Sequence, residues 1–449
     1  MPFVSGFRTW RSAAILLCAL APPALCSAAQ DKDPDFSLAD TVQAGPFHMA
    51  PFFTLKDLGY DGNTRLGSGE STSDYTVTLG PGARAVAPLG RLAAVSIWEQ
   101  IDYSVFARQS DLNHVNNSLR SKVHVYLRDF TVYADGEQIS SRDRPNNEID
   151  YRIRTKATQG KLGFKWNPGT RGNADLFVRS TGFDYDPGRP DVPAGADPGT
   201  TEQAVRSGEA IAESLQRVET TAGMSGSLRF RPRTSALLDL RESRIDFDND
   251  TDSAGNPRQR DSEAHSVMGG LEFDPAGSLR GYMKAGFKRL VPDDPGVEGY
   301  SGLIADASLS ARLLGRGEVR AVYQRDTGFS TFGSNLFYLN DKKALSYEHY
   351  MNSRLSLELG RQLEDASYPA AVQLYPTGST KCPLVTSPGF GCSPQLRRDD
   401  IVTDKVTVRY RLGPALRIGL SVGRWERNSN FNTEDAERPT IATLLEYTP

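Results

Sequence analysis

The chain has 449 residues, of which 38% are hydrophobic and 24% charged, and its formal net charge is −3. No run of about 18 apolar residues occurs, which excludes transmembrane helices. A slightly acidic balance also excludes the basic surface of a nucleic-acid-binding protein, so we expect no nucleic-acid partner.

The first residues have the pattern of a secretory signal peptide. Arg8 and Arg11 precede an apolar core at residues 13–21, and Ser27-Ala28-Ala29 forms a small-residue cleavage site. We therefore predict a signal peptide at 1–29. Residues 30–45 are polar and patternless, and we expect a short periplasmic segment there with no room for a plug domain. The remainder, 46–449, is expected to form one domain.

Residues 279–288 and 303–313 show the clearest secondary-structure pattern. Apolar or small residues occupy one parity, while residues such as Arg280, Lys284, Asp306 and Arg312 occupy the other. A period of two indicates a β-strand, because successive side chains point to opposite faces. These strands are longer than the usual 5–6 residues of soluble proteins, and a strand that crosses a bilayer needs about 9–11.

The same alternation recurs along the chain and predicts about 18 strands. Segments with this pattern lie at 47–58, 75–79, 95–105, 116–127, 130–141, 148–166, 174–185, 224–230, 238–240, 267–273, 279–288, 303–313, 319–323, 345–347, 355–359, 406–410, 416–422 and 437–447. Within 148–166 the apolar parity changes, which suggests a β-bulge near Gly160. Glu99 breaks the apolar parity of its strand.

Short turns and longer polar loops alternate between these segments. Arg128-Asp129 is an example of a short turn, and residues 248–261 are an example of a longer loop. Short periplasmic turns and longer extracellular loops are typical of outer-membrane barrels. The sequence thus predicts an all-β fold, a single transmembrane antiparallel β-barrel. A soluble periplasmic β-protein is the alternative, and it would remain in the soluble fraction.

Three strings near the start resemble a family of outer-membrane β-barrel porins whose members often occur in exopolysaccharide loci. They are FTLKDLGYDGN at 53–63, DYTVTLGPG at 74–82 and RLAAVSIWEQIDYSVF at 91–106. The characteristic feature is a first strand that ends in a Gly-Tyr-Asp-x-Asn corner, followed by a strand with Gly-Pro near its end. The resemblance implies a conduit in the Gram-negative outer membrane, with secreted polysaccharide as an expected cargo and periplasmic export components as expected partners.

If the apolar parity faces lipid, the opposite parity faces a lumen in which basic residues recur. One hypothesis is a positive-leaning channel for anionic solutes or acidic sugar polymers. The other is an ordinary wet lumen of charges paired across strands, with acids such as Asp102, Asp239, Glu272, Asp306 and Glu358. The predicted lumen-lining basic residues are Lys122, Lys161, Lys165, Arg229, Arg241, Arg280, Lys284, Lys288, Arg312, Arg320, Lys405, Arg409, Arg411 and Arg417.

Several aromatic residues fall toward strand ends. We expect them to form the girdles at the two membrane interfaces that transmembrane barrels carry. Any that face inward would instead offer stacking surfaces for sugars. The residues concerned are Phe52, Tyr60, Trp98, Trp166, Phe230, Phe273 and Tyr447.

Outside the signal peptide the chain has two cysteines, Cys382 and Cys392, in a stretch rich in Pro, Gly and Ser. In an oxidising compartment the expected state is a disulfide, and the alternative is two free thiols. The five histidines are scattered and no Gly-x-Ser-x-Gly elbow occurs. We therefore predict no catalytic, metal or cofactor site and no enzymatic activity.

Taken together, these features predict an outer-membrane channel, with exopolysaccharide export as its specific role. The alternatives are a general solute porin and a structural or adhesive barrel with no transport role. Outer-membrane lipid and lipopolysaccharide are the expected surroundings of the wall.

Overall fold

The computed structural model describes most of the chain after the predicted signal peptide. The described residues are 34–38, 41–64, 71–144, 146, 148–149, 152–169, 171–186, 212–249, 259–274, 277–313, 315–332, 335–372, 393–431 and 434–447. Within them, no helix combines the length and the hydropathy needed to cross a membrane. The predicted signal peptide, residues 1–29, lies outside this part of the chain.

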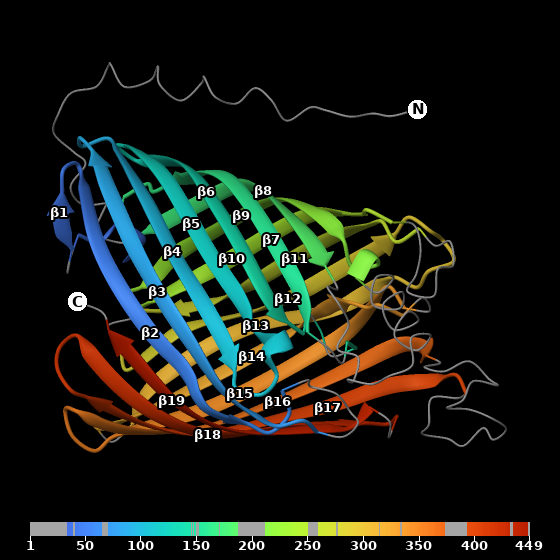
Figure 1. The fold of residues 1–449 in the computed structure, drawn as a ribbon. Coiled ribbons are helices and arrows are strands. Elements are labelled where there is room, and N and C mark those ends of the chain that lie inside the picture. Colours follow the sequence, from blue (N-terminus) through green and yellow to red (C-terminus); the bar gives the residue numbers. More distant parts are fainter. Residues whose placement is uncertain are drawn as a thin grey trace, which may run out of the picture.

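The described chain forms one continuous antiparallel sheet that closes on itself (Figure 1). Each strand from β2 to β19 pairs with its sequence neighbours, and β19 returns to pair with β2, so 18 strands make the barrel. The predicted all-β antiparallel barrel is thereby confirmed. Closure leaves no edge strand with unpaired backbone groups, which is the condition for crossing a bilayer with strands.

The strands are regular and mostly 12–18 residues long, and two single 3-10 turns accompany them. Their bounds are η2 Pro34–Phe36, β1 Val42–Ala44, β2 Phe47–Asp61, β3 Asp74–Leu89, β4 Ala93–Phe106, η3 Ser110–Leu112, β5 His114–Leu127, β6 Phe130–Asp143, β7 Ile153–Trp166, β8 Gly172–Asp186, β9 Arg217–Arg231, β10 Thr234–Phe247, β11 Ser262–Phe273, β12 Leu279–Pro292, β13 Tyr300–Leu313, β14 Gly317–Phe329, β15 Phe337–Tyr350, β16 Leu355–Val372, β17 Gln395–Arg411, β18 Leu416–Ser429 and β19 Ala436–Tyr447.

The two ends of the barrel differ in their connections. At one end the strands are joined by turns of two to five residues, such as 128–129 and 232–233; at the other end the connections are longer, such as 107–113 and 144–152. The extra strand β1 pairs with the start of β2 at the short-turn end, and β19 finishes there (Figure 1). By the usual arrangement of such barrels, the short-turn end is periplasmic.

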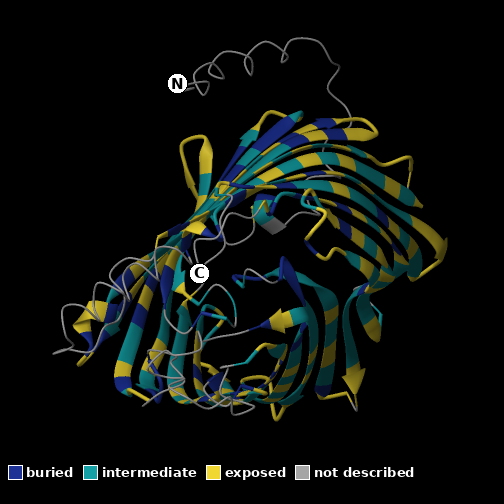
Figure 2. Ribbon diagram, turned by 90° about the vertical axis from the view of Figure 1, so that its right-hand side faces the viewer, coloured by how far each residue is buried: buried dark blue, intermediate teal, exposed yellow. Residues whose placement is uncertain are grey.

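Alternation along the strands separates two faces of the wall (Figure 2). Large apolar side chains such as Leu162, Phe287, Leu303 and Val406 are exposed on the outer face. Their strand neighbours point inward and are mostly polar or charged. An exposed apolar face around a closed sheet is the surface that a lipid bilayer covers, which accounts for the period-two pattern of the sequence.

The predicted phase change in residues 148–166 is wrong. Strand β7 begins only at Ile153 and pairs with β6 and β8 without a register shift, so no bulge occurs at Gly160. Ile149 and Ile153 instead pack together on the inside of the barrel. The apolar residues at the start of this segment therefore pack inside the barrel, against a loop, and do not face the membrane.

A bulge does occur in the first barrel strand. The register between β2 and β3 shifts between Lys56 and Gly59, and Asp57 adopts a positive φ of 54°. Aspartate tolerates this conformation better than most residues that carry a side chain. Because the extra residue reverses the side-chain parity, the bulge turns Asp61 toward the inside of the wall.

Asp61 holds the seam between the first and last barrel strands. Its carboxylate accepts hydrogen bonds from Nε of Arg438 at 2.9 Å and from Nη2 at 2.6 Å, which tie β2 to β19. Arg152, from the connection before β7, lies 4.0 Å away. Asp61 is only 4% exposed, so this bidentate pair is shielded from water and stronger than a surface ion pair.

The rest of the Gly-Tyr-Asp-x-Asn corner continues the seam. The Gly62 amide donates to the Pro439 carbonyl at 2.8 Å, and Nδ2 of Asn63 donates to the Glu437 carbonyl at 3.1 Å. At Gly59 the backbone carbonyl of the opposite strand lies where a Cβ would sit, so a side chain would clash. The corner residues are thus required by the geometry of closure.

We predict that Asp61→Ala weakens closure of the barrel. Removing the carboxylate leaves Arg438 without its partner and should lower the free energy of unfolding by about 3 kcal/mol. This value is near the lower end of the range for a broken buried pair, because the Arg438 side chain keeps some contact with solvent. Urea unfolding in detergent measures the effect. Asp400→Asn, an exposed carboxylate 3.7 Å from Arg398, is the control and should cost under about 1 kcal/mol. Equal losses in the two variants would contradict this role.

Candidate functional site

The interior of the barrel is the candidate site, and the predicted lumen-lining residues all sit on its inner face. Each lies in a strand on the parity opposite to the exposed apolar side chains, as Lys284 does beside the outward Met283 and Ala285. Lys405 is likewise an immediate neighbour of the exposed Val406. Their role in passage of solutes stays a prediction.

Many of these cations are paired with carboxylates of neighbouring strands. Lys284 lies 3.5 Å from both Asp239 and Asp306, and Arg241 donates two hydrogen bonds to Asp239. This part of the wall fits the hypothesis of a mixed, paired lumen. The other pairs are Lys122 with Asp35, Lys161 with Asp175, Arg280 with Glu318, Lys288 with Asp326, Arg409 with Glu348 and Glu358, and Arg417 with Glu446.

Other predicted cations form no ion pair with any described acid. Within the described residues, six of them have no acidic group within 4 Å, and Lys165 instead lies 4.8 Å from the ring centroid of Tyr133. Lys165 and Arg312 lie opposite Asp175 and Glu318 in the register, while a cation with no acid beside it adds to the positive potential of the water that fills the lumen. The six residues are Lys165, Arg229, Arg312, Arg320, Lys405 and Arg411.

The inner wall also carries packed aromatic rings, made possible by glycines on adjacent strands. The ring of Tyr133 lies over Gly163, where an added Cβ would come within 2.3 Å of it, and Phe177 lies over Gly223 in the same way at 2.4 Å. The ammonium of Lys161 sits 5.0 Å from Tyr133 and 4.3 Å from Phe177. Cation–π contacts with both rings, together with the ion pair to Asp175, fix the position of this ammonium group.

Two residues predicted for the interface girdle face inward instead. Phe52 and Trp98 lie on the inner face and stack with ring centroids 5.6 Å apart, and the guanidinium of Arg120 lies 5.0 Å from the Trp98 ring. The girdle prediction is wrong for this pair, because both side chains lie on the polar parity of their strands, with Thr54 and Lys56 in β2 and with Ser96 and Gln100 in β4. Trp166 and Tyr447 are exposed.

At the long-loop end, connecting segments fold inward and pack on the inner wall. Three apolar clusters anchor them. Ile149, Ala212 and Leu215 pack on β7 and β8; Val297, Leu336 and Phe337 pack on β10 to β12; and Phe332 and Phe431 pack on Tyr338 and Tyr368. Burial of these apolar side chains fixes the loops over the lumen and narrows it.

Two polar contacts join loops from distant parts of the wall. The carboxylate of Glu148 accepts hydrogen bonds from the backbone N–H and the hydroxyl of Thr331, the latter at 2.6 Å. These residues belong to the β6–β7 and β14–β15 connections, eight strands apart in the barrel. Arg260 is 4% exposed and donates to the carbonyls of Ser214 and Ser330. The loops therefore meet across the lumen.

At the short-turn end, residues ahead of the barrel enter the lumen. Phe36 is 2% exposed in a pocket formed by Val86, Ala94 and Tyr126. The Asp35 carboxylate lies 2.5 Å from Nζ of Lys122, and the Asp35 carbonyl accepts a hydrogen bond from Ser96. The segment predicted as periplasmic and patternless thus places at least η2 against the inner wall.

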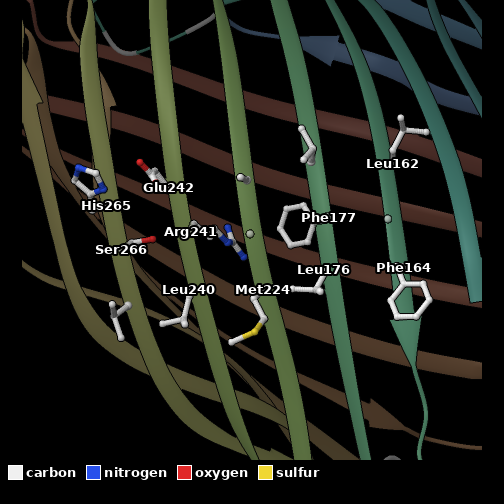
Figure 3. Close-up of a pocket in the computed structure, with 15 residues that line it drawn as sticks. Leu162, Phe164, Leu176, Phe177, Met224, Leu240, Arg241, Glu242, His265 and Ser266 are labelled. Atoms are coloured by element: carbon white, nitrogen blue, oxygen red, sulfur yellow. The ribbon is translucent and has the colours of Figure 1, made fainter. Parts of the chain in front are cut away.

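A separate hollow of about 820 Å³ lies on the outer face of β7 to β11 (Figure 3). Leu162, Phe164, Leu176 and Met224, which surround it, belong to the exposed apolar set. This groove faces the membrane and is not part of the lumen.

Within the described residues, no group of three or more His, Cys, Asp or Glu could hold a metal ion. Cys382 and Cys392 lie outside the described residues, so their disulfide stays a prediction.

Sequence reasoning missed the residues that connect loops and termini. Glu148, Arg260 and Thr331 lie in polar stretches without periodicity, and only their partners in space give them a role. Phe36 offered a signal, because it is a single aromatic residue in an otherwise polar segment.

We predict that Phe36→Ala releases the segment at 34–38 from the inner wall. Truncating a buried phenylalanine costs about 3–5 kcal/mol, more than so short a segment can replace. Hydrogen exchange of the amides in 34–38 should become faster and single-channel conductance should rise. Leu38→Ala, at an exposed position, is the control and should change neither. Unchanged exchange in Phe36→Ala would refute this anchoring.

We also predict that Glu148→Gln loosens the contact between the loops. Loss of the charge weakens the hydrogen bonds to Thr331, which are worth about 1.5–3 kcal/mol for a charged acceptor. Single-channel conductance should rise, and Thr331→Val should add little to it in the double variant because both changes remove one interaction. Glu272→Gln, on the inner face near a short turn, is the control. Additive effects of the two loop substitutions would contradict the contact.

Comparison with known proteins extends the structural assignment. A model of the family described as Putative beta-barrel porin 2 matches residues 40–445. No curated protein matches the chain. Solved structures with a similar fold include OpdK of Pseudomonas aeruginosa with vanillate, at 10% identity and a TM-score of 0.45 over 89% of this chain and 98% of that one. OccK2 (OpdF) of the same organism has 11% identity and a TM-score of 0.46, and the match covers 89% of this chain and 97% of that one.

The FrpB iron transporter of Neisseria meningitidis has 10% identity and a TM-score of 0.42 over 85% of this chain and 62% of that one. The family match covers nearly the whole barrel and agrees with the resemblance seen in the strings at 53–106. An outer-membrane location and a channel fold follow from the family match. The chain belongs to the beta-barrel porin family described as Putative beta-barrel porin 2.

Proposed function

We propose that this porin conducts anionic solutes across the outer membrane, with secreted acidic polysaccharide as its cargo. The observation that carries the proposal is the set of inner-face cations without an acidic partner, such as Lys165, Arg320 and Lys405. In a water-filled pore with low-dielectric walls, unpaired charges of one sign raise the local concentration of the opposite sign.

The polysaccharide cargo rests on the family resemblance and has support from the inner wall. The stacked rings of Phe52 and Trp98 offer an apolar face to the lumen, and the guanidinium beside them, that of Arg120, is paired with Glu137 at 2.7 Å. Sugar rings stack through their C–H faces on aromatic side chains, while a guanidinium binds carboxylates. A sugar polymer would therefore find a stacking surface on this patch, and its carboxylates would bind the unpaired cations elsewhere on the inner wall.

A general solute porin is the second candidate, and the inward loops favour it. The contact between Glu148 and Thr331 joins loops from opposite parts of the wall, which restricts the space for a polymer unless the loops separate. A structural or adhesive barrel without transport is the third, and its function would lie in the outer loops. The expectation that the protein is not an enzyme stays a prediction.

We propose outer-membrane lipid and lipopolysaccharide as partners of the outer wall. On β17 and β18 the outward pairs Val408–Leu420 and Val406–Val422 are apolar, and the next pair is Asp404–Arg424. Arg361, which is exposed, lies 3.7 Å from Asp404. Charges directly above an apolar band match the level where lipid phosphates begin.

We propose periplasmic export components as partners at the short-turn end.

We predict that the channel prefers anions and that the unpaired cations cause the preference. In a salt gradient across a planar bilayer, Lys165→Glu, Arg320→Glu and Lys405→Glu together should move the reversal potential toward cation selectivity. Lys343→Glu, Arg361→Glu and Arg398→Glu make the same change on the outer face and should leave the potential unchanged. An unaltered potential in the inner-face variant would defeat the proposal.

The cargo is tested by conductance with and without an acidic polysaccharide. Block of a steady current by the polymer supports an export conduit. Conductance that is indifferent to the polymer favours the general porin. No conductance from demonstrably folded protein favours the structural barrel.

A further inference from the structure

A second cavity, of about 390 Å³, lies inside the barrel beneath the inward loops. It extends along the inner wall from β8 to β15, and Asn146 of the β6–β7 connection borders it. Its charged lining is unequal, with four cations, Arg179, Arg217, Arg241 and Lys288, and two acids, Glu219 and Asp326. The cavity thus lies within the lumen, next to the inward loops.

Three of these cations are already neutralised. Arg217 donates to Glu219 at 2.8 Å, and Nζ of Lys288 lies 2.7 Å from Asp326. Arg241 donates two hydrogen bonds to Asp239, which is 6% exposed and lies just outside the lining. Each pair fixes the position of its cation in the wall and leaves little net charge for a ligand.

Arg179 differs from the other three. It lies on the inner face of β8 between Lys161 and Thr221 of the adjacent strands, and it forms no ion pair within the described residues. It is neither fully buried nor fully exposed. A guanidinium presents a planar fork of N–H donors that matches a carboxylate in bidentate geometry. Arg179 is therefore the one lining cation that forms no ion pair with the described acids, and it borders a space with room for a carboxylate.

The rest of the lining suits the body of an organic acid. Ile245, Met268 and Leu290 supply apolar surface from β10 to β12, and Thr221 and Ser243 supply hydroxyl groups within hydrogen-bond distance of each other, at 2.9 Å. A cavity with one free guanidinium, a few hydroxyls and an apolar side fits a carboxylate attached to a compact body. A simple inorganic anion would leave the apolar side unused.

We propose that this cavity is a binding site for the carboxylate of a passing solute, with Arg179 as the residue that binds it. This inference rests on the proposed function and makes it more specific, because it places one carboxylate subsite on the inner wall. The carboxylate comes either from a free organic acid or from a uronate unit of a polymer, since both present the same group to Arg179.

The test is calorimetric titration of the folded protein in detergent with glucuronate, and with glucose as the neutral counterpart. Glucuronate should bind and glucose should not. Arg179→Gln should weaken glucuronate binding about ten-fold, the usual worth of a hydrogen bond to a charged group. Arg179→Lys keeps the charge and should retain part of the affinity, which separates loss of the site from loss of the fold.

Arg229→Gln is the matched control, because Arg229 is also an inner-face arginine without an acid in the described residues but lies outside this cavity. It should leave glucuronate binding unchanged. Equal binding of glucose and glucuronate, or equal loss in the Gln variants of Arg179 and Arg229, would overturn the proposal. Calorimetry measures binding without any ion current. A protein that binds glucuronate through Arg179 but does not conduct would therefore refute the proposed function and leave the binding site intact.

A short polyglucuronate added to the same titration distinguishes the two sources. Competition with glucuronate supports a polymer-borne carboxylate, and binding of glucuronate without competition supports a free acid.

Discussion

Closure of the sheet is the constraint on which the rest of this structure depends. An open sheet of this length would expose unpaired backbone groups to lipid at both edges, and each would cost several kcal/mol. The seam between β2 and β19 removes both edges, and Asp61 with Arg438 ties it at the loop end. The bulge at Asp57 contributes to the seam, because it turns the Asp61 side chain to the inner face, where Arg438 binds it.

A closed wall makes its two ends independent of each other. The short-turn end is held by η2, where Phe36 and Asp35 contact the inner wall. The long-loop end is held by apolar clusters and by contacts such as that of Glu148 with Thr331. Both sets of contacts lie within the lumen and not in the wall, so they can change without opening the sheet. Any control of passage would act through them.

The inner wall satisfies most of its charges internally and leaves selected cations free. Lys284 and Arg241 share Asp239, while Arg179 on the neighbouring wall has no such partner within the described part. Neither of the two simple descriptions, a fully paired lumen or a uniformly cationic one, fits alone. Paired charges fix side chains along the wall, and the unpaired ones are the basis of the anion preference that we propose.

The sequence by itself determined the barrel, its strand number and the face of most residues, because a lipid-facing wall imposes a period of two that is local along the chain. It also located the Gly-Tyr-Asp-x-Asn corner, although the reason for that corner, the seam with Arg438, came from pairing of residues 377 positions apart. Only the tertiary structure decided that Phe52 and Ile149 face inward, since one bulge or one folded loop reverses parity without a local signal. The contacts of Glu148, Arg260 and Phe36 depend on closure, which brings distant loops and the N-terminal segment into one enclosed space.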